Sequence, residues 1–234
     1  MATTFDSIPD AQRADFLKRL AIYGLGETSI LQPDLVVPSK TTMTLSADTR
    51  SFLRPHVLAT TDLNELKNWI GVPDKRFKEG LHSAFSKIQI PMPKRLPAAP
   101  AARQVKKAPE VAGLVQRAYS AADFDKIRLA TMSYLWGNST HVSDFKSIVE
   151  EAIGEFQVAV WPFLTITVHT GAVLEIGGGA NVLCAWKIII QEGGQVRGLN
   201  SNLHVQCTIL QKEQIFIRPG INKVLKTSAV AQKK

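Results

Sequence analysis

Residues 166–174, ITVHTGAVL, align with residues 188–196, IIIQEGGQV, when the chain is compared with itself at an offset of 22 residues. A repeat of this length, built of a strand, a turn with glycine and a second strand, is typical of one coil of a β-solenoid. Stacked coils share a core that a single coil cannot build. The offset therefore predicts a short β-solenoid-like stack in which Gly171 and Gly193 form structural turns at one corner, where the backbone needs a conformation that a Cβ disfavours.

The wider region, residues 156–217, is rich in Val, Ile, Leu and Thr, is broken by Gly and Asn, and shows no helical period. This pattern indicates strands. An antiparallel sandwich or meander explains it as well, with residues 177–179 and 191–194 as hairpin turns, so both arrangements stay open. Because helical patterns dominate the residues before it, the predicted fold class is α+β, with a helical N-terminal part followed by a β-rich C-terminal domain.

Helix signals occur at several places before the β-rich region. Asp62 with Glu65, and Ser120 with Asp123, have the spacing of a capping box, in which side chains satisfy free amides at the start of a helix. Apolar side chains also recur at helical intervals. We expect helices over residues 10–23, 62–70, 77–88, 120–136 and 145–153, with short extended segments at residues 35–37 and 42–45.

Residues 91–109, PMPKRLPAAPAARQVKKAP, carry five prolines. Proline removes a backbone donor and fixes φ, so a packed helix or a central strand cannot form there. The segment is therefore the best domain boundary in the chain. The predicted division is a helical N-terminal domain over residues 1–90, a Pro/Ala-rich basic linker over 91–109, a helical connector or cap over 110–154, a β-rich domain over 155–225 and a basic tail over 226–234.

The formal net charge of +8 favours an anionic partner. Much of the excess lies in the linker, which has five basic residues and no acid. Solvated, flexible charge is the simpler interpretation, because no aromatic residue interleaves with these charges. Contacts to nucleic acid would then be non-specific and sensitive to salt. The candidate anion-binding residues are Lys94, Arg95, Arg103, Lys106 and Lys107.

The sequence shows no catalytic or metal-binding pattern. The five histidines are scattered, without an HxH or HxxxH pair. Glu175 and Glu192 fall on different sides of a coil, and no aspartate follows Asp144, so the carboxylate cluster of a hydrolase or lyase is missing. GxSxG and P-loop motifs are also absent. We expect no enzymatic activity, no metal and no cofactor, and we expect Cys184 and Cys207 to be small buried hydrophobes.

The expected function is that of a non-enzymatic structural or interaction subunit. Its β-rich domain would self-assemble or dock on partner proteins, because strand edges at the ends of a short stack pair readily unless they are covered. One alternative is an anion-binding module, which would contact nucleic acid or a membrane surface through the basic linker and tail. Another is a carbohydrate-binding β-solenoid, in which Trp161 and Trp186 would stack on a sugar ring.

The sequence also bears on where the protein resides. No apolar run is long enough to cross a bilayer, and the first residues lack the pattern of a signal peptide. We therefore expect no transmembrane segment, and a protein that is cytoplasmic or is exported without a cleavable signal peptide.

Overall fold

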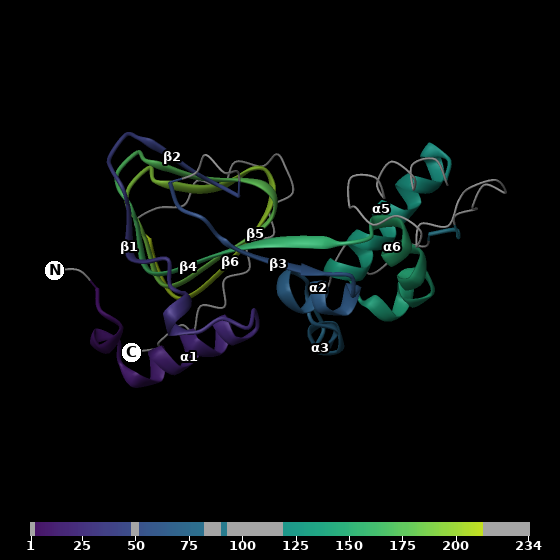
Figure 1. The fold of residues 1–234 in the computed structure, drawn as a ribbon, viewed down its shortest axis with the longest axis horizontal. Coiled ribbons are helices and arrows are strands. Elements are labelled where there is room, and N and C mark those ends of the chain that lie inside the picture. Colours follow the sequence, from purple (N-terminus) through teal and green to yellow (C-terminus); the bar gives the residue numbers. More distant parts are fainter. Residues whose placement is uncertain (1–2, 48–51, 82–89, 93–118, 213–234) are drawn as a thin grey trace. The chain divides into compact units, whose positions relative to one another are not determined.

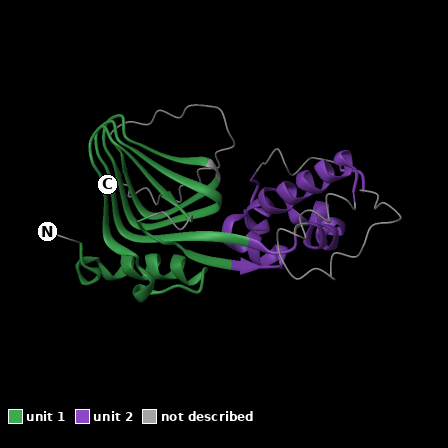
Figure 2. Cartoon of the chain, turned by 45° about the horizontal axis from the view of Figure 1, so that its top comes forward, with its two compact units in different colours: residues 1–58, 157–234 green, residues 59–156 purple. Residues whose placement is uncertain are grey.

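The computed structural model describes residues 3–47, 52–81, 90–92 and 119–212 of the 234-residue chain. The chain forms two compact units, residues 1–58 with 157–234 and residues 59–156. They are coloured green and purple in Figure 2. We call the first the β-rich unit and the second the helical unit.

The strands form one sheet of parallel strands, curled as a half-barrel (Figure 1). The path through the sheet runs β1-β4-β5-β2, while β3 pairs with β4 and β6 pairs with β5. The four pairs whose register is defined, β1 with β4, β2 with β5, β4 with β5 and β5 with β6, are all parallel. The strands are β1 (Gln32–Val37), β2 (Thr42–Ser46), β3 (His56–Thr60), β4 (Phe156–Val168), β5 (Val173–Ile190) and β6 (Gln195–Lys212).

The register of β4, β5 and β6 matches the offset of 22 residues found in the sequence. Ile166 on β4 pairs with Ile188 on β5, and Ile188 pairs with Leu210 on β6. Leu183 on β5 likewise pairs with Val205 on β6, 22 residues later. The antiparallel sandwich or meander does not hold for these strands, because residues that are one repeat apart lie side by side on strands that run in the same direction.

The extended segments predicted near residues 35–37 and 42–45 are confirmed as β1 and β2. β1 pairs with β4, and β2 with β5, at one common sequence offset, as Val37 with Val168 and Met43 with Leu174 illustrate. The turn between β1 and β2 therefore lies over the turn between β4 and β5. These two short strands continue the rows of the sheet, although they come far earlier in the chain than β4.

Alternating apolar side chains build the core inside the curl. β-branched and aromatic residues favour such a pleated, buried surface. Trp161 is completely buried, and its Nε1 donates to Oδ1 of Asn181 at 3.0 Å. The amide nitrogen of Asn181 donates in turn to the carbonyl of Gly178 at 2.9 Å, which satisfies a buried polar group. Other core members are Leu35, Val37, Leu45, Phe163, Ile166, Val168, Leu174, Ile176, Leu183 and Ile188.

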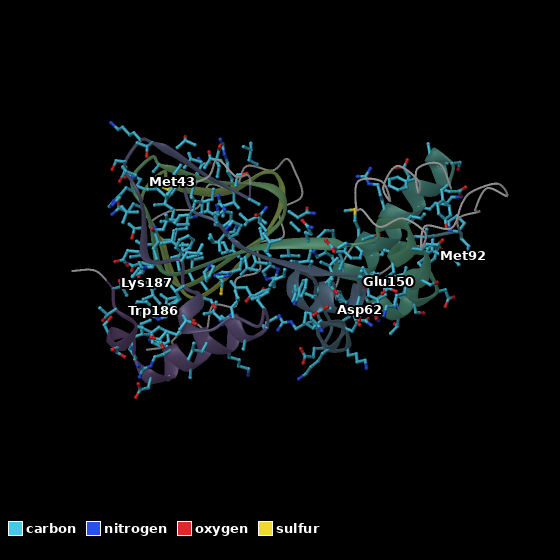
Figure 3. All side chains as sticks on the ribbon, viewed as in Figure 1. Met43, Asp62, Met92, Glu150, Trp186 and Lys187 are labelled. Carbon is cyan, nitrogen blue, oxygen red and sulfur yellow. The ribbon has the colours of Figure 1, made fainter. Side chains whose placement is uncertain are left out.

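Helix α1 (Asp10–Ala21) packs against β5 and β6 on the outside of the curl (Figure 1). Its apolar side carries Phe16 and Leu20, both fully buried. Polar bonds fix its position as well, since Trp186 Nε1 donates to Oε1 of Gln12 at 3.0 Å. Figure 3 shows Trp186 on the side of the sheet that faces α1. Two 3-10 turns, η1 (Phe5–Ser7) and η2 (Glu27–Ser29), flank the helix.

The helical unit contains the remaining described helices. Ser120 caps α5 by accepting from the amide of Asp123 at 3.1 Å, as its spacing predicts. Asp62 caps α2 by accepting from the amide of Asn64 at 2.8 Å, whereas Glu65 accepts from the hydroxyl of Thr60. The elements are α2 (Leu63–Ile70), α3 (Asp74–Lys78), α5 (Ala121–Trp136), η5 (Ser139–Phe145) and α6 (Lys146–Ile153).

A buried lysine ties α2 to the end of α5. Lys67 Nζ donates to the carbonyls of Tyr134 at 2.6 Å and Gly137 at 2.9 Å, and lies 2.8 Å from Oδ1 of Asp74. The carbonyls at a helix C-terminus lack intrahelical partners, so the ammonium group acts as a cap. Burial lowers the pKa of Lys67, and the hydrogen bond to Asp74 opposes that shift.

A second cluster ties α2 to α6. Lys146 Nζ lies 3.0 Å from Oδ1 of Asp62 and 3.5 Å from Oε1 of Glu150. The same Glu150 oxygen accepts from the amide of Leu63 at 3.0 Å. Figure 3 shows Asp62 and Glu150 close together in the helical unit. Both ends of α2 are thus fixed by side chains or carbonyls of other helices.

The boundaries of the two units lie between residues 58 and 59 and between residues 156 and 157, the second of them two residues from the boundary predicted at residue 154. Residues 1–58 belong to the β-rich unit, because β1 and β2 pair with β4 and β5. The helical unit combines residues from both sides of the predicted linker, of which only residues 91 and 92 are described.

The predicted helix over residues 77–88 is described only at its start. Pro73 precedes α3, which begins at Asp74 and ends at Lys78. Gly80 then turns the chain with φ of +92°, so the helix that contains Phe77 does not continue through Leu81. Residues 82–89 lie outside the described part.

Candidate interaction surface

The stack of strands ends in β6 on one side and in β1 and β2 on the other. β6 is 18 residues long and pairs with β5 from Gln195 to Lys212. Within the described ranges, no strand pairs with the opposite edge of β6 or with the outer edges of β1 and β2. Such an edge presents a row of N–H and C=O groups that can accept another strand. These two edges, which we call the β6 edge and the β1–β2 edge, are the candidate interaction surface.

Exposed apolar side chains lie on the strands that have only one neighbour. Val36 on β1 is 46% exposed, Val57 on β3 is 54% exposed and Leu199 on β6 is 43% exposed. Among the described residues of β4 and β5, no large apolar side chain reaches comparable exposure. Within the sheet, exposed apolar side chains of this size therefore lie on the outermost strands.

The core is also less well covered at these ends. Leu174 and Ile188 on β5 are buried, whereas Val196 and Leu210 on β6 and Met43 on β2 are only partly buried in the same cluster. The outermost coil of any stack lacks neighbours on one side. A further strand on either edge would complete the burial of these side chains.

A charged pair lies across the outer face near the β6 edge. Glu175 on β5 and Arg197 on β6 are register partners, and Nε of Arg197 donates to Oε1 of Glu175 at 2.8 Å. Thr44 on β2 is the register partner of Glu175 on its other side, with its hydroxyl 3.4 Å from Oε2. This pair is absent from the sequence-based candidates, although the repeat places Glu175 directly opposite Arg197.

The corner between the strands repeats through the stack. Gly171 and Gly193 have φ of +66° and +68°, and Lys40 occupies the equivalent place in the β1–β2 turn with φ of +57°. A Cβ on Gly193 would lie 3.6 Å from the Cα of Gly171. The amide of Gly171 donates to the carbonyl of Glu192 at 2.9 Å. The two glycines thus stack at one corner, where the left-handed conformation favours glycine.

Both cysteines are buried thiols. Burial raises the pKa of Cys184 to about 12 and also raises the pKa of Cys207. Tyr23 is buried nearby, where burial raises its pKa and the amide of Gln206 donates to its hydroxyl at 2.7 Å. The thiolate is the reactive form of cysteine, so these side chains serve packing.

The two tryptophans predicted to stack on a ligand lie in different surroundings. Trp161 is completely buried in the core, so its indole presents no face to a sugar in this structure. Trp186 is partly exposed and bonded to Gln12 on α1. The two therefore do not form a common platform.

Two histidines in the described part lie within hydrogen-bond distance of oxygen atoms elsewhere in the β-rich unit. Nε2 of His56 lies 2.7 Å from the carbonyl of Ser29, and Nδ1 of His169 lies 2.8 Å from Oε1 of Gln191. The described residues contain no group of three or more His, Cys, Asp or Glu side chains that could hold a metal ion.

Some predicted features lie outside the described residues. They include the basic tail over residues 226–234 and the candidate anion-binding residues Lys94, Arg95, Arg103, Lys106 and Lys107.

None of the helices in the described ranges combines the length and the apolar character needed to span a membrane. In comparison with known proteins, the chain matches no protein-family model, no curated protein and no solved structure.

Proposed function

We propose that this protein is a non-enzymatic structural or interaction subunit, which self-assembles or docks on partner proteins through the edges of its β-rich unit. The observation that carries the proposal is β6, a strand of 18 residues that has one strand neighbour among the described residues. A long edge of this kind is a template for adding a strand.

We further infer that the β-rich unit is a short β-solenoid. Successive strands are related by the sequence repeat, and the corner glycines Gly171 and Gly193 stack on each other. In a solenoid each coil contacts only its neighbours, so the terminal coils need caps or partners. The exposed side chains Val36 and Leu199 lie on such terminal coils.

Side chains elsewhere in the unit support a structural role. The thiol of Cys184 is held protonated by burial, and Trp161 and Asn181 satisfy each other in the core. His169 bonds to Gln191, which lies one repeat away in the sequence. The indole of Trp161 and the imidazole of His169 thus bond to residues of the next strand or turn, as expected of side chains with a structural role.

The proposal can be tested by placing a charge on each edge. Lysine on an edge strand disfavours strand pairing, so Val36→Lys and Leu199→Lys should each reduce self-association or partner binding. The matched control is Ile22→Lys, because Ile22 is 45% exposed but follows helix α1. Sedimentation equilibrium over a wide concentration range would measure association. The proposal requires the wild-type protein to exceed the mass of one chain, 25.7 kDa, or to bind a partner that both edge variants bind more weakly.

If Ile22→Lys weakened association as much as the edge variants do, the effect would come from net charge and not from the edges. The proposed function would be wrong if the wild-type protein stayed a monomer and both edge variants bound every partner as tightly as the wild-type protein does.

A further inference from the structure

The two ends of the stack differ in how the core is covered. At one end, Leu31, which precedes β1, and Leu53, which follows β2, pack against the core from outside the strands. At the other end, the partly buried side chains of the core cluster, Val196, Leu203 and Leu210, lie on β6 itself. Successive residues of a strand point their N–H and C=O groups to alternate sides, so many of these groups on β6 face away from β5. An added strand on β6 would cover both the backbone groups and the core.

The last part of β6 carries two inward-facing side chains of different character. Leu210 lies opposite Ile188 on β5, and Lys212 lies opposite Ile190. The earlier members of both rows, on β1 and β4, are buried apolar residues of the core. An ammonium group therefore takes the place of an apolar side chain where the second row ends.

The two basic side chains of β6, Arg197 and Lys212, differ in their partners. Nε of Arg197 donates to Oε1 of Glu175 at 2.8 Å. Lys212 forms no ion pair with any residue that the structure describes. Burial lowers the pKa of Lys212, because desolvation disfavours the charged form. A strand added along this part of β6 would bury the ammonium group further, which is costly unless a carboxylate pairs with it.

From the uncovered edge and the inward lysine, we propose that β6 accepts an extended segment of another protein, which sets a carboxylate beside Lys212 and, two residues away, an apolar side chain beside Leu210. A strand without the acid would bury the ammonium group without a partner. An inward charge on an edge strand discourages such pairing, so Lys212 selects acidic segments. This inference rests on the proposed function, because it names the partner of the same surface.

Charge favours another protein over the segments of this chain. Since β6 contains no Asp or Glu, two copies that met at their β6 edges would bring like charges together. Asp34 is the acid of β1, but it precedes the inward-facing Leu35, so its carboxylate lies on the other face of the strand. Residues 213–234 contain five bases and one acid, which follows Lys212 directly in the chain. Charge complementarity is therefore best met by an acidic strand from elsewhere.

Two synthetic peptides labelled with a fluorophore, TVTETVT and TVTKTVT, would test the inference. In an extended peptide, the central charge and both valines lie on one face. Because a valine lies two residues from the charge on each side, either strand direction can set a valine beside Leu210. Fluorescence polarisation with the full chain should show TVTETVT binding at least about tenfold more tightly than TVTKTVT, because only the first supplies a carboxylate to Lys212.

Charge reversal locates the preference. Lys212→Glu should bind TVTKTVT more tightly than TVTETVT. The matched control is Lys187→Glu, which makes the same change of charge on β5 (Figure 3), where Thr165 and Ile209 occupy both sides and leave no edge. Lys187→Glu should keep the wild-type preference. Both variants lower the net charge equally, so a general attraction to a basic chain would affect them alike.

Protection of the buried thiols Cys184 and Cys207 from a thiol reagent would show that each variant remains folded. The inference would be overturned if the wild-type protein bound both peptides equally, bound neither at millimolar concentration, or lost its preference to the same extent in both folded variants. Each of these results leaves the proposed function intact if Val36→Lys or Leu199→Lys weakens an association. The proposed function itself is wrong if neither of those edge variants affects any binding.

Discussion

The β-rich unit and the helical unit are stabilised in different ways. In the β-rich unit, one relation repeats, since residues of β5 lie between their counterparts one repeat earlier on β4 and one repeat later on β6. In the helical unit, single side chains make contacts that occur once, such as Lys67 at the end of α5 and Lys146 between Asp62 and Glu150.

The difference bears on where each unit can make contacts. A repeating stack has no intrinsic end, so its last strand resembles the one before it and offers the same edge. The contacts in the helical unit satisfy the carbonyls at the end of α5 and the amides at the start of α2, and thereby close off helix ends. This difference supports assembly through the β-rich unit.

The largest expected effect is that of Trp161→Ala. This change empties a fully buried site and leaves Oδ1 of Asn181 without the donor from Trp161, so it should destabilise the β-rich unit by about 3–5 kcal/mol. The chain has two cysteines, Cys184 and Cys207, and both are buried in that unit. Their rate of reaction with a thiol reagent should therefore rise sharply.

The matching change in the helical unit is Lys67→Met, which removes the buried ammonium group and retains an apolar side chain. Under the proposed contrast it should leave the thiols protected. Equal exposure of the thiols in both variants would show that the two units unfold as one, and the contrast would then be wrong.

Much of the β-rich unit could be predicted from the sequence, because repetition is visible in a single chain. Aligning Ile166 with Ile188 predicts the register that the strands adopt. The role of β1 and β2 could not be found in this way, since their offset from β4 and β5 occurs only once and involves short segments.

The helical unit shows what local signals can and cannot predict. The caps at Ser120 and Asp62 depend on residues two or three positions away, and their spacing indicates both helix starts. The hydrogen bond from Lys67 to the carbonyl of Gly137 joins residues that are far apart in the sequence, and no sequence repeat indicates that they are neighbours. Prediction thus succeeds where the partner of a residue lies at a short or a recurring distance.

A smaller effect is expected of Asp74→Asn, which sharpens the contrast from the helical side. The change leaves Lys67 with carbonyl partners alone, so it should cost about 1–3 kcal/mol, toward the lower end because Asp74 is partly exposed. Hydrogen exchange would locate the loss at the amide of Val72, which donates to the carbonyl of Leu135 at 2.7 Å. The control Asp125→Asn makes the same charge change in an exposed pair with Arg128 and should cost little.

The same variant should also change the pH dependence of the helical unit. Burial alone would raise the pKa of Asp74, but hydrogen bonds from Lys67 and Ser139 outweigh it and lower the pKa below its ordinary 3.8. A lowered pKa means that the folded state favours the carboxylate, so the stabilisation is present above pH 3.8 and is lost as the pH falls further. In the wild-type protein, the stabilisation by the Asp74 carboxylate should therefore be lost in acid. If the stability of Asp74→Asn depended on acid pH in the same way, Asp74 would not be the group responsible.

The smallest expected effect is that of Gly193→Ala, which tests the corner of the β-rich unit. With φ of +68°, alanine at this position is strained, and we expect a loss of about 1 kcal/mol. The nearest atoms would be at 3.6 Å, an ordinary contact, so the loss comes from the backbone alone. Gly26→Ala is the control, because Gly26 is extended with φ of −140° and open space beside it. Chemical denaturation, monitored through the exposure of the thiols, should show a lower free energy of unfolding for Gly193→Ala and almost no change for Gly26→Ala. Equal losses would mean that this corner does not need glycine, in agreement with Lys40 at the equivalent place in the first turn.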